Sequence, residues 1–359
     1  MAAATIAASR PACVRAISNV MIEPDLPALA RALAALPGFA AIAPDDLQPL
    51  PRKGLAHMHW RIANAAAVLR VPVRLAPGDA AETQLARQVA GFGRAAASGH
   101  VPRLIAVVPP SAEMPLGALV VEAIAGRAPH LPADAPAIAE ALAAVHGIML
   151  PAPRARAPLA DPTDSFAATL AQIERLAAEA GGAELAPAAA RAIEDELAWA
   201  RSHARRPHAP PPKALILTDT HAGNFIVRDD GRAVFVDLEK VQYGCPAIDV
   251  AHTTLRPSAR WDPDCDHVWT ASEIAAFVAH YLERIGPDRE AALRPWLLAF
   301  RRLVWLRTTT MYWRRLSRHE FTDVLAPDVA RHVQAIVADA LAPAAIAAVR
   351  GEWLGASDS

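Results

Sequence analysis

Residues 217–227 of the chain read LTDTHAGNFIV. A short polar turn that holds Asp219 and Asn224 lies there between two apolar runs. Another apolar run, at 233–236, is followed by Asp237 and Glu239. Such runs are typical of short buried strands. We therefore expect strands at 215–217 and 233–236 to form a hairpin that brings Asp219, Asn224 and Asp237 to one end.

These side chains predict a particular chemistry. Three oxygen-bearing groups at one place suit a hard cation such as Mg²⁺. They also match what phosphoryl transfer needs: one carboxylate accepts the proton of the attacking hydroxyl, while an amide oxygen and a second carboxylate hold the metal against the nucleotide phosphates. The interval from Asp219 to Asn224 is that of a kinase catalytic loop.

The rest of the chain divides into two regions with different sequence patterns. The first third predicts a helix at 25–40 and then a small sheet with one inserted helix at 80–97. Its strands are predicted at 59–62, 67–71, 103–108 and 118–122. The remainder is mostly helical, with helices predicted at 136–146, 165–180, 187–203, 272–285, 289–315 and 330–349.

The segment 218–252, TDTHAGNFIVRDDGRAVFVDLEKVQYGCPAIDVAH, resembles the core of the aminoglycoside phosphotransferase and choline kinase superfamily. That family typically shows a His-Gly-Asp-x-His-x-x-Asn loop, an Ile-Asp-Trp-Glu strand end and a Gly-x-Pro-x-x-Asp-Leu-Ala segment. The resemblance covers roughly residues 53–313, specifically in the middle and loosely at both ends. It implies an α+β, bilobal, protein-kinase-like fold, with a small antiparallel-sheet N-lobe carrying one key helix and a larger, mostly helical C-lobe. Residues 1–121 would form an N-terminal extension and the nucleotide-covering lobe, and residues 122–359 the C-lobe.

The resemblance also implies roles for single residues. Asp219 would be the catalytic base, and Asn224 and Asp237 would bind Mg²⁺. Asp249 would be the buried aspartate that supports the catalytic loop. Glu239 stands where the family often has a carboxylate near the metal, and it is also a candidate for the acceptor site.

The nucleotide site is implied by the first third of the chain. Gly54 lies in a segment that resembles the nucleotide-covering hairpin, and Arg70 sits where the family has a strand-borne cation that reaches the phosphates. Glu82 would pair with that cation. Glu122 and Ala123 resemble the hinge whose backbone would hold adenine. The donor would be ATP or GTP.

Candidates for the acceptor site come from the C-terminal third. Trp305, Tyr312 or Arg307 would line the pocket, with a core-packed face and a solvated basic face of the helix as the alternative. Asp262 belongs to a small acidic cluster that would attract a cationic acceptor such as an amino sugar. His57 and His59 share one strand face, and we expect two exposed histidines there rather than a metal pair.

Several of these residues have plainer explanations. Asp219, Asn224 and Asp237 could serve only as turn residues. Arg70 could be a surface cation on an edge strand, and Glu82 could be a carboxylate favoured by the helix dipole.

Composition narrows the class of protein. The net charge is −1 and 53% of the residues are hydrophobic, so no global field attracts nucleic acid or a membrane surface. Three widely spaced cysteines predict no disulfide framework and favour the cytoplasm. No apolar stretch has the length of a membrane span. The frequent Ala, Pro and Arg indicate a bacterial coding bias. The oligomeric state stays open.

The sequence thus predicts a small-molecule kinase that phosphorylates a hydroxyl of an aminoglycoside-like compound, an amino alcohol or a sugar. The alternative is a catalytically weak, kinase-like protein that binds a nucleotide or a partner. Two departures from the family pattern motivate this alternative: Leu217 stands where the family's loop has histidine, and the nucleotide-covering segment has only one glycine, Gly54.

Overall fold

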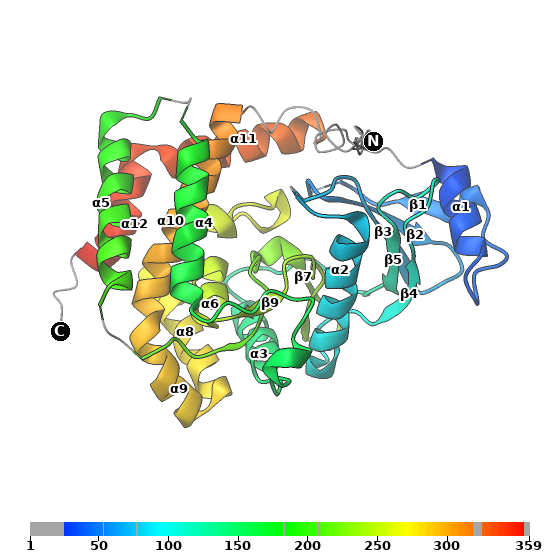
Figure 1. Cartoon of the computed structure of the whole chain (residues 1–359), viewed down its shortest axis with the longest axis horizontal. Helices are drawn as coiled ribbons and strands as arrows, with labels where there is room; N and C mark the ends of the chain where they lie inside the picture. Colours follow the sequence, from blue (N-terminus) through cyan, green and yellow to red (C-terminus); the bar gives the residue numbers. More distant parts are fainter. Residues whose placement is uncertain are drawn as a thin grey trace, which may run out of the picture.

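The computed structural model describes residues 25–52, 54–76, 78–181, 184–206, 209–318 and 325–354. Figure 1 shows a strand-rich lobe at one end of the molecule and a larger helical lobe at the other. The predicted boundary between them near residue 121 stays a prediction.

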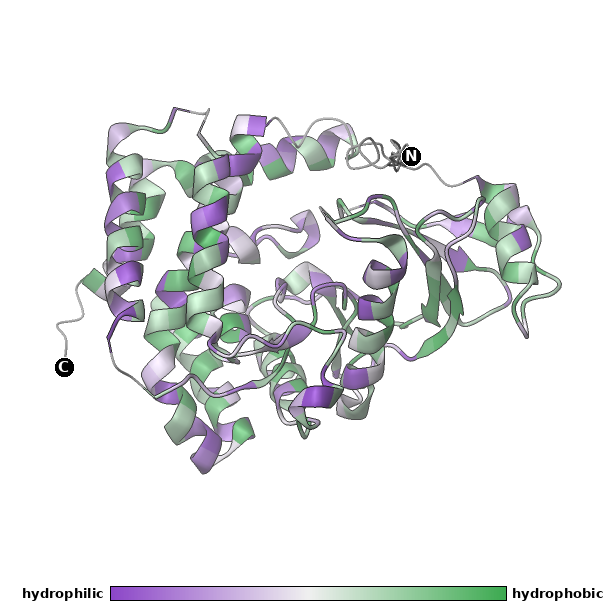
Figure 2. Ribbon diagram, viewed as in Figure 1, coloured by the Kyte–Doolittle hydropathy of each residue, from purple (hydrophilic) through white to green (hydrophobic). Residues whose placement is uncertain are grey.

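The small lobe is built on a five-stranded antiparallel sheet with the strand order β1-β2-β3-β5-β4. Its strands are β1 (Leu47–Pro49), β2 (His57–Ile62), β3 (Ala67–Pro72), β4 (Leu104–Val108) and β5 (Ala118–Glu122). The tight turn between β2 and β3 contains Asn64 with a φ of 61°, a conformation that asparagine tolerates better than most residues. Figure 2 shows these strands coloured mostly as hydrophobic.

Helices cover both faces of this sheet. Helix α1 (Leu26–Ala34), capped by the Asp25 side chain, packs on one face, where Leu29 and Leu33 meet Trp60 and Leu69. Helix α2 (Ala81–Ala95) covers the other face. Because neighbouring residues of a strand point to opposite faces, Arg70 lies on the α2 side, toward the helical lobe.

Two further sheets have two short strands each, and they correct the predicted hairpin. Strand β6 (Ala214–Ile216) pairs with β9 (Gln242–Gly244), and β7 (Phe225–Val227) pairs with β8 (Ala233–Phe235). The expected pairing of 215–217 with 233–236 is therefore wrong. The loop between β6 and β7 nevertheless starts beside the segment that follows β8, because β9 returns the chain to β6.

The helical lobe contains most of the core. Its helices are α3 (Ala135–His146), α4 (Ser165–Glu179), α5 (Pro187–Ala204), α6 (Ala247–Thr254), α7 (Arg256–Ala259), α8 (Ala271–Ile285), α9 (Pro287–Leu293), α10 (Leu297–Arg318), α11 (Pro327–Leu341) and α12 (Pro343–Leu354).

Two predicted helices are divided in the structure. The helix predicted at 289–315 is interrupted by a 3-10 turn at Arg294–Trp296 that contains Pro295, and the one predicted at 330–349 is interrupted before Pro343. Proline lacks the N–H that would continue the helix. Among the described helices, none alone has the length and apolar composition of a membrane span, and α11 and α12 reach it only as a pair bent by 59°.

Candidate active site

The loop after β6 is fastened by one buried carboxylate. Asp249, on α6, is fully buried and accepts the backbone N–H of Leu217 at 2.7 Å and that of Thr218 at 2.8 Å. His146 Nε2 lies 3.0 Å from Asp249 Oδ2. Thr218 has a φ of 65°, which turns the chain sharply before Asp219. Asp249 thus has the contacts of a residue that supports this loop.

Leu217 takes part in this arrangement through its backbone alone. Its side chain is fully buried in the main hydrophobic core. The imidazole near Asp249 is instead that of His146, whose Nδ1 lies 2.7 Å from the hydroxyl oxygen of Tyr281. The loop is therefore anchored without a histidine at position 217.

Asp219 is held at the end of the loop by basic side chains. Lys240 Nζ lies 2.5 Å from Asp219 Oδ2, and His252 Nε2 lies 3.7 Å from Oδ1. Burial alone would raise the pKa of Asp219, but Lys240, His221 and His252 hold it well below the usual range. The amide nitrogen of Asn224 donates to the Asp219 carbonyl oxygen at 2.8 Å, which leaves the Asn224 amide oxygen as a candidate metal ligand.

Asp237 faces the small lobe. The guanidinium of Arg70 donates to Asp237 Oδ1 at 2.6 Å and to the Val236 carbonyl at 2.7 Å. The Arg70 guanidinium also lies 5.8 Å from the ring centre of Phe92 on α2. Glu82 is exposed in the first turn of α2. The expected pairing of Arg70 with Glu82 is thus corrected, because Asp237 is the carboxylate that Arg70 contacts.

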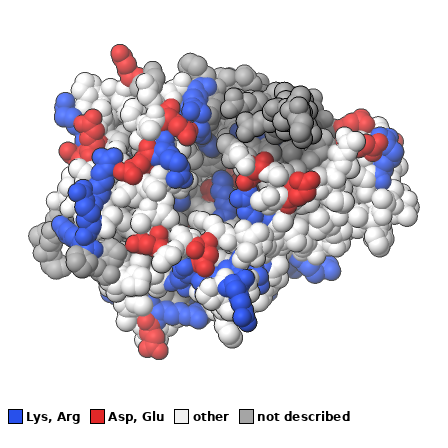
Figure 3. Space-filling model, in the orientation of Figure 1, with Lys and Arg blue, Asp and Glu red and all other residues white. Residues whose placement is uncertain are grey.

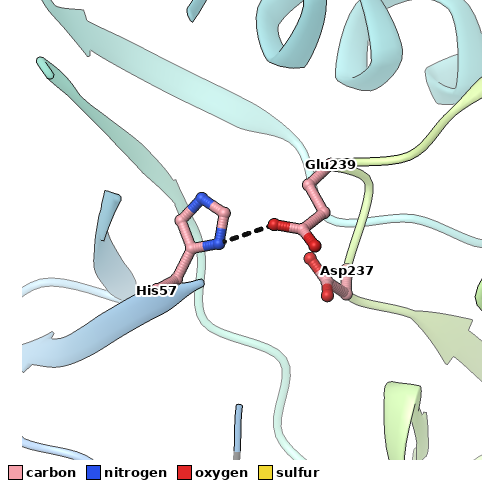
Figure 4. Close-up of side chains that lie close together, drawn as sticks. All are labelled: His57, Asp237 and Glu239. Atoms are coloured by element: carbon pink, nitrogen blue, oxygen red, sulfur yellow. Dashed lines mark ion pairs between the residues drawn. The ribbon is translucent and has the colours of Figure 1, made fainter. Parts of the chain in front are cut away.

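Glu239 lies beside Asp237 and contacts a histidine of the small lobe. His57 Nδ1 is 3.0 Å from Glu239 Oε2, and Figure 4 shows the two carboxylates adjacent with the imidazole facing them. One ligand atom from each of His57, Asp237 and Glu239 lies within 4.8 Å of the others. Burial would raise the pKa of Glu239, but the hydrogen bond from His57 and the charge of Lys240 lower it.

The expectation of two exposed histidines on β2 is wrong for both, because His59 is half-buried and His57 is buried. The Nε2 atom of His57 lies 3.3 Å from the amide oxygen of Gln88 on α2. The neighbouring ring of His59 stacks on that of His57 at 6.1 Å, and burial lowers the pKa of His59 well below its usual value. The carboxylate oxygens of Asp237 and Glu239 and the amide oxygen of Asn224 are the kinds of ligand atom that a divalent cation prefers.

The remaining candidates for nucleotide binding lie in the small lobe and its edge. Gly54 is exposed before β2, and a Cβ there would meet only open space. The N–H of Glu122 donates to Arg103 O, and that of Ala123 donates to Ala66 O, both at 2.9 Å. These two donors are engaged within the protein, so adenine binding at the hinge would use other atoms.

Three candidates for the acceptor site, Trp305, Tyr312 and Asp262, are buried in the structure. Trp305 is buried in the core against Trp353, with ring centres 5.8 Å apart, so it is not available to line a pocket. Tyr312 is buried and stacks on Trp261 at 5.9 Å. Asp262 is buried against Gly223 of the catalytic loop, where any Cβ would collide with its carboxylate.

A family comparison fits this geometry. Residues 46–296 match the model of the phosphotransferase enzyme family. The chain belongs to this family. A comparison with curated proteins gave no match.

Solved structures share the fold of this phosphotransferase. A choline/ethanolamine kinase family protein from Mesorhizobium loti has 20% identity and a TM-score of 0.58, with 91% of this chain and 99% of that chain covered. Choline kinase from Cryptosporidium parvum Iowa II has 12% identity and a TM-score of 0.60, with coverage of 92% and 100%. An amicoumacin kinase solved with AMP-PNP and Ca²⁺ has 13% identity and a TM-score of 0.53, with coverage of 84% and 89%. The α+β, kinase-like fold expected from the sequence is confirmed.

Several residues of this candidate site could not be predicted from the sequence. They are polar or basic side chains: Gln88, Lys240 and His252. Lys240 carried a usable signal, because it is one of three lysines in the chain and directly follows Glu239. The others are placed by tertiary packing and had no local pattern.

Proposed function

We propose that the protein transfers the γ-phosphoryl group of ATP or GTP to a hydroxyl of a small polar molecule. The observation that carries the proposal is the position of Asp219. Its ionised carboxylate is fixed by a loop that Asp249 anchors, and Lys240 joins it to the carboxylate of Glu239.

The residues present fit a divalent cation and a nucleotide. Asp237, Glu239 and the amide oxygen of Asn224 would hold Mg²⁺, which supplies electrostatic stabilisation of the phosphates when bound. Arg70 is placed to contact a phosphate once its bond to Asp237 yields. A nucleotide and a divalent ion accompany the amicoumacin kinase structure, which supports this use of the site.

Asp219 would orient the acceptor hydroxyl. In the transfer, the bond from the γ-phosphorus to its bridging oxygen breaks, a bond to the acceptor oxygen forms, and the nucleoside diphosphate leaves. The hydroxyl proton passes to Asp219 and then to solvent. Because Lys240 holds the pKa of Asp219 low, this carboxylate is a weak base. Its main contribution would then be positioning, with the proton moving late.

The test is a coupled assay for nucleoside diphosphate over a panel of acceptors, with Asp219→Asn beside the wild type. We expect at least one acceptor to stimulate turnover and Asp219→Asn to reduce it by about 10³-fold or more, since a positioned proton acceptor contributes on this scale. Asp229→Asn, on the exposed β7–β8 turn, is the matched control. Nucleotide binding without transfer to any acceptor would favour the alternative of a kinase-like binding protein.

A cytoplasmic location in a bacterium belongs to the proposal. It is supported by the composition of the chain, by the buried free thiols of Cys245 and Cys265, and by the requirement for a nucleotide donor.

A further inference from the structure

We infer that the acceptor carries an anionic group near the hydroxyl that is phosphorylated, and that Arg307 binds this group. This inference rests on the proposed function, because it names the substrate class of the same site. It replaces the expectation of a cationic acceptor.

Arg307 is an arginine without a carboxylate partner in the described part of the chain. It lies half-buried on α10, and its one hydrogen bond is a long one, 3.4 Å from Nη2 to the carbonyl oxygen of Thr218, the residue before Asp219. The arginines around it are paired with carboxylates: Arg301 with Glu352, Arg302 with Glu196, and Arg256 and Arg260 with Asp339.

Burial of an unpaired guanidinium is unfavourable, and burial lowers the pKa of Arg307 even though Asp219 and Asp249 act to raise it. A bound anion would relieve this cost. A guanidinium offers parallel N–H donors that match a carboxylate or a phosphate. Its position next to Thr218 places such an anion within a few bonds of a hydroxyl at Asp219.

Two histidines supply further unsatisfied groups beside Asp219. The Nδ1 atoms of His221 and His252 are buried and have no hydrogen-bond partner among the residues that the structure describes. Burial lowers the pKa of both imidazoles, to about 3 for His252, so they are neutral near pH 7. Neutral imidazoles suit the hydroxyl groups of an acceptor and give an ammonium group no counter-charge.

The acidic residues that would attract a cationic acceptor are already engaged. Asp219 pairs with Lys240, and Asp266 pairs with Arg260 at 2.7 Å. Asp262 is buried and accepts the N–H of Asp264 at 2.9 Å. Figure 3 shows the surface hollowed between the lobes, with Lys and Arg side chains visible inside the hollow. Lys240 and Arg307 therefore place positive charge next to Asp219.

The test uses matched acceptors that differ in charge. D-glycerate and D-gluconate carry a carboxylate, glycerol 3-phosphate and glucose 6-phosphate carry a phosphate, glycerol and glucose are neutral, and choline, ethanolamine and glucosamine are cationic. Binding is measured by calorimetry in the presence of Mg²⁺ and AMP-PNP. Transfer is measured with ATP or GTP by the release of the nucleoside diphosphate. Comparison of the carboxylate-bearing compounds with the phosphate-bearing compounds shows which of the two anions Arg307 binds.

We expect the wild-type protein to bind and phosphorylate anionic acceptors in preference to their neutral and cationic counterparts. Arg307→Gln should weaken this binding by about 30-fold or more, the loss expected for a charge-assisted bidentate contact. Its affinity for Mg²⁺ and AMP-PNP should be unchanged. Arg307→Lys keeps the positive charge and loses the two parallel N–H donors, so its affinity for anionic acceptors should lie between those of the wild type and Arg307→Gln. Arg318→Gln removes an arginine from the same helix that is paired with Glu179, and it should behave as wild type.

The opposite results separate the two proposals. Preferential binding of neutral or cationic acceptors, no binding of any acid, or equal binding by wild type and both Arg307 variants would overturn the inference and leave the proposed function standing. Binding of an acid that depends on Arg307 without any transfer would support anion binding by Arg307 and count against the proposed function.

Discussion

The guanidinium of Arg70, on the small sheet, donates to Asp237 at 2.6 Å, and this contact joins the two lobes at the proposed metal site. His57 and Glu239 make a second such contact at 3.0 Å. In this state, each of the two acidic residues that follow β8 is bonded to a basic residue of the small lobe. Binding of a metal-nucleotide complex would exchange these partners.

Arg70→Gln tests the link between the lobes. We expect a free energy of unfolding lower by about 1–3 kcal/mol, because Asp237 and the Val236 carbonyl lose charge-assisted donors. The affinity for Mg²⁺ and ATP should fall by about tenfold or more if the same guanidinium contacts a phosphate. Urea unfolding and calorimetry measure the two effects. Arg61→Gln, at an exposed position of the neighbouring strand, is the control, and equal values for the two variants would contradict the prediction.

Lys240→Met tests how Asp219 stays ionised. Lys240 opposes the effect of burial, which alone would raise the pKa of Asp219. The depressed pKa keeps Asp219 charged down to strongly acidic pH, so the wild-type pH profile should show no acid limb from this group near neutrality. Loss of Lys240 should raise the pKa of Asp219, so that kcat/KM declines on the acidic side within the measurable pH range. The maximum value of kcat/KM should also be lower than in the wild type. Lys213→Met removes a lysine paired with Asp161 and should leave the profile unchanged. An identical profile for Lys240→Met would count against this role.

Asp249→Asn tests the anchor of the catalytic loop. The carboxylate accepts two backbone N–H groups and contacts His146, and an amide in its place presents a donor to at least one of them. We expect the free energy of unfolding to fall by about 2–4 kcal/mol, and turnover to fall with it. Denaturant unfolding and the coupled assay measure both, with Asp229→Asn as the control. Unchanged stability would show that the loop is held by other contacts.

His252 makes a prediction about pH and stability. Burial lowers the pKa of its imidazole to about 3, below the value of about 6.5 expected in the unfolded chain. The unfolded state therefore takes up the proton first, and the contribution to stability is complete above pH 6.5 and declines as the pH falls toward 3. Between pH 7.5 and pH 5 the loss should be about 2 kcal/mol.

His252→Gln should remove that part of the pH dependence, whereas His130→Gln, at an exposed position, should not. The measurement is urea unfolding at both pH values. A pH dependence of the same size in His252→Gln and wild type would refute the assignment.

Leu217→His restores the residue that the family pattern has at this position. We expect no gain in activity and a loss of about 3 kcal/mol in unfolding free energy, because a fully buried leucine is exchanged for an imidazole. Leu217→Met, which nearly conserves volume, should cost less than about 1.5 kcal/mol. Turnover well above wild type in Leu217→His would show that the leucine limits catalysis.

The fold could be predicted because the segment around Asp219, Asp237 and Asp249 keeps a characteristic order along the chain. The pairing of the short strands could not, since β6, β7 and β8 are three-residue apolar runs without distinguishing patterns. The prolines at 295 and 343 could have indicated the two helix breaks. The periodic apolar residues around them favoured continuous helices instead.

The site was predictable where its residues come from one segment. Asp219, Asn224, Asp237 and Glu239 are all on the loop and strand ends between β6 and β9. Arg307 comes from α10, and its relation to Asp219 depends on how that helix packs beneath the loop. Trp305 was misplaced for the same reason, because a shift of two residues along a helix turns a side chain from the site into the core.

The contact between Gly223 and Asp262 has a consequence for changing what this enzyme accepts. The two positions fill one space, so a library that varies residue 223 alone would yield mostly misfolded loops. Replacing Asp262 with glycine first would free that space for a side chain at 223, whereas alanine would keep the Cβ that blocks it. The two positions are best varied as a pair, in that order.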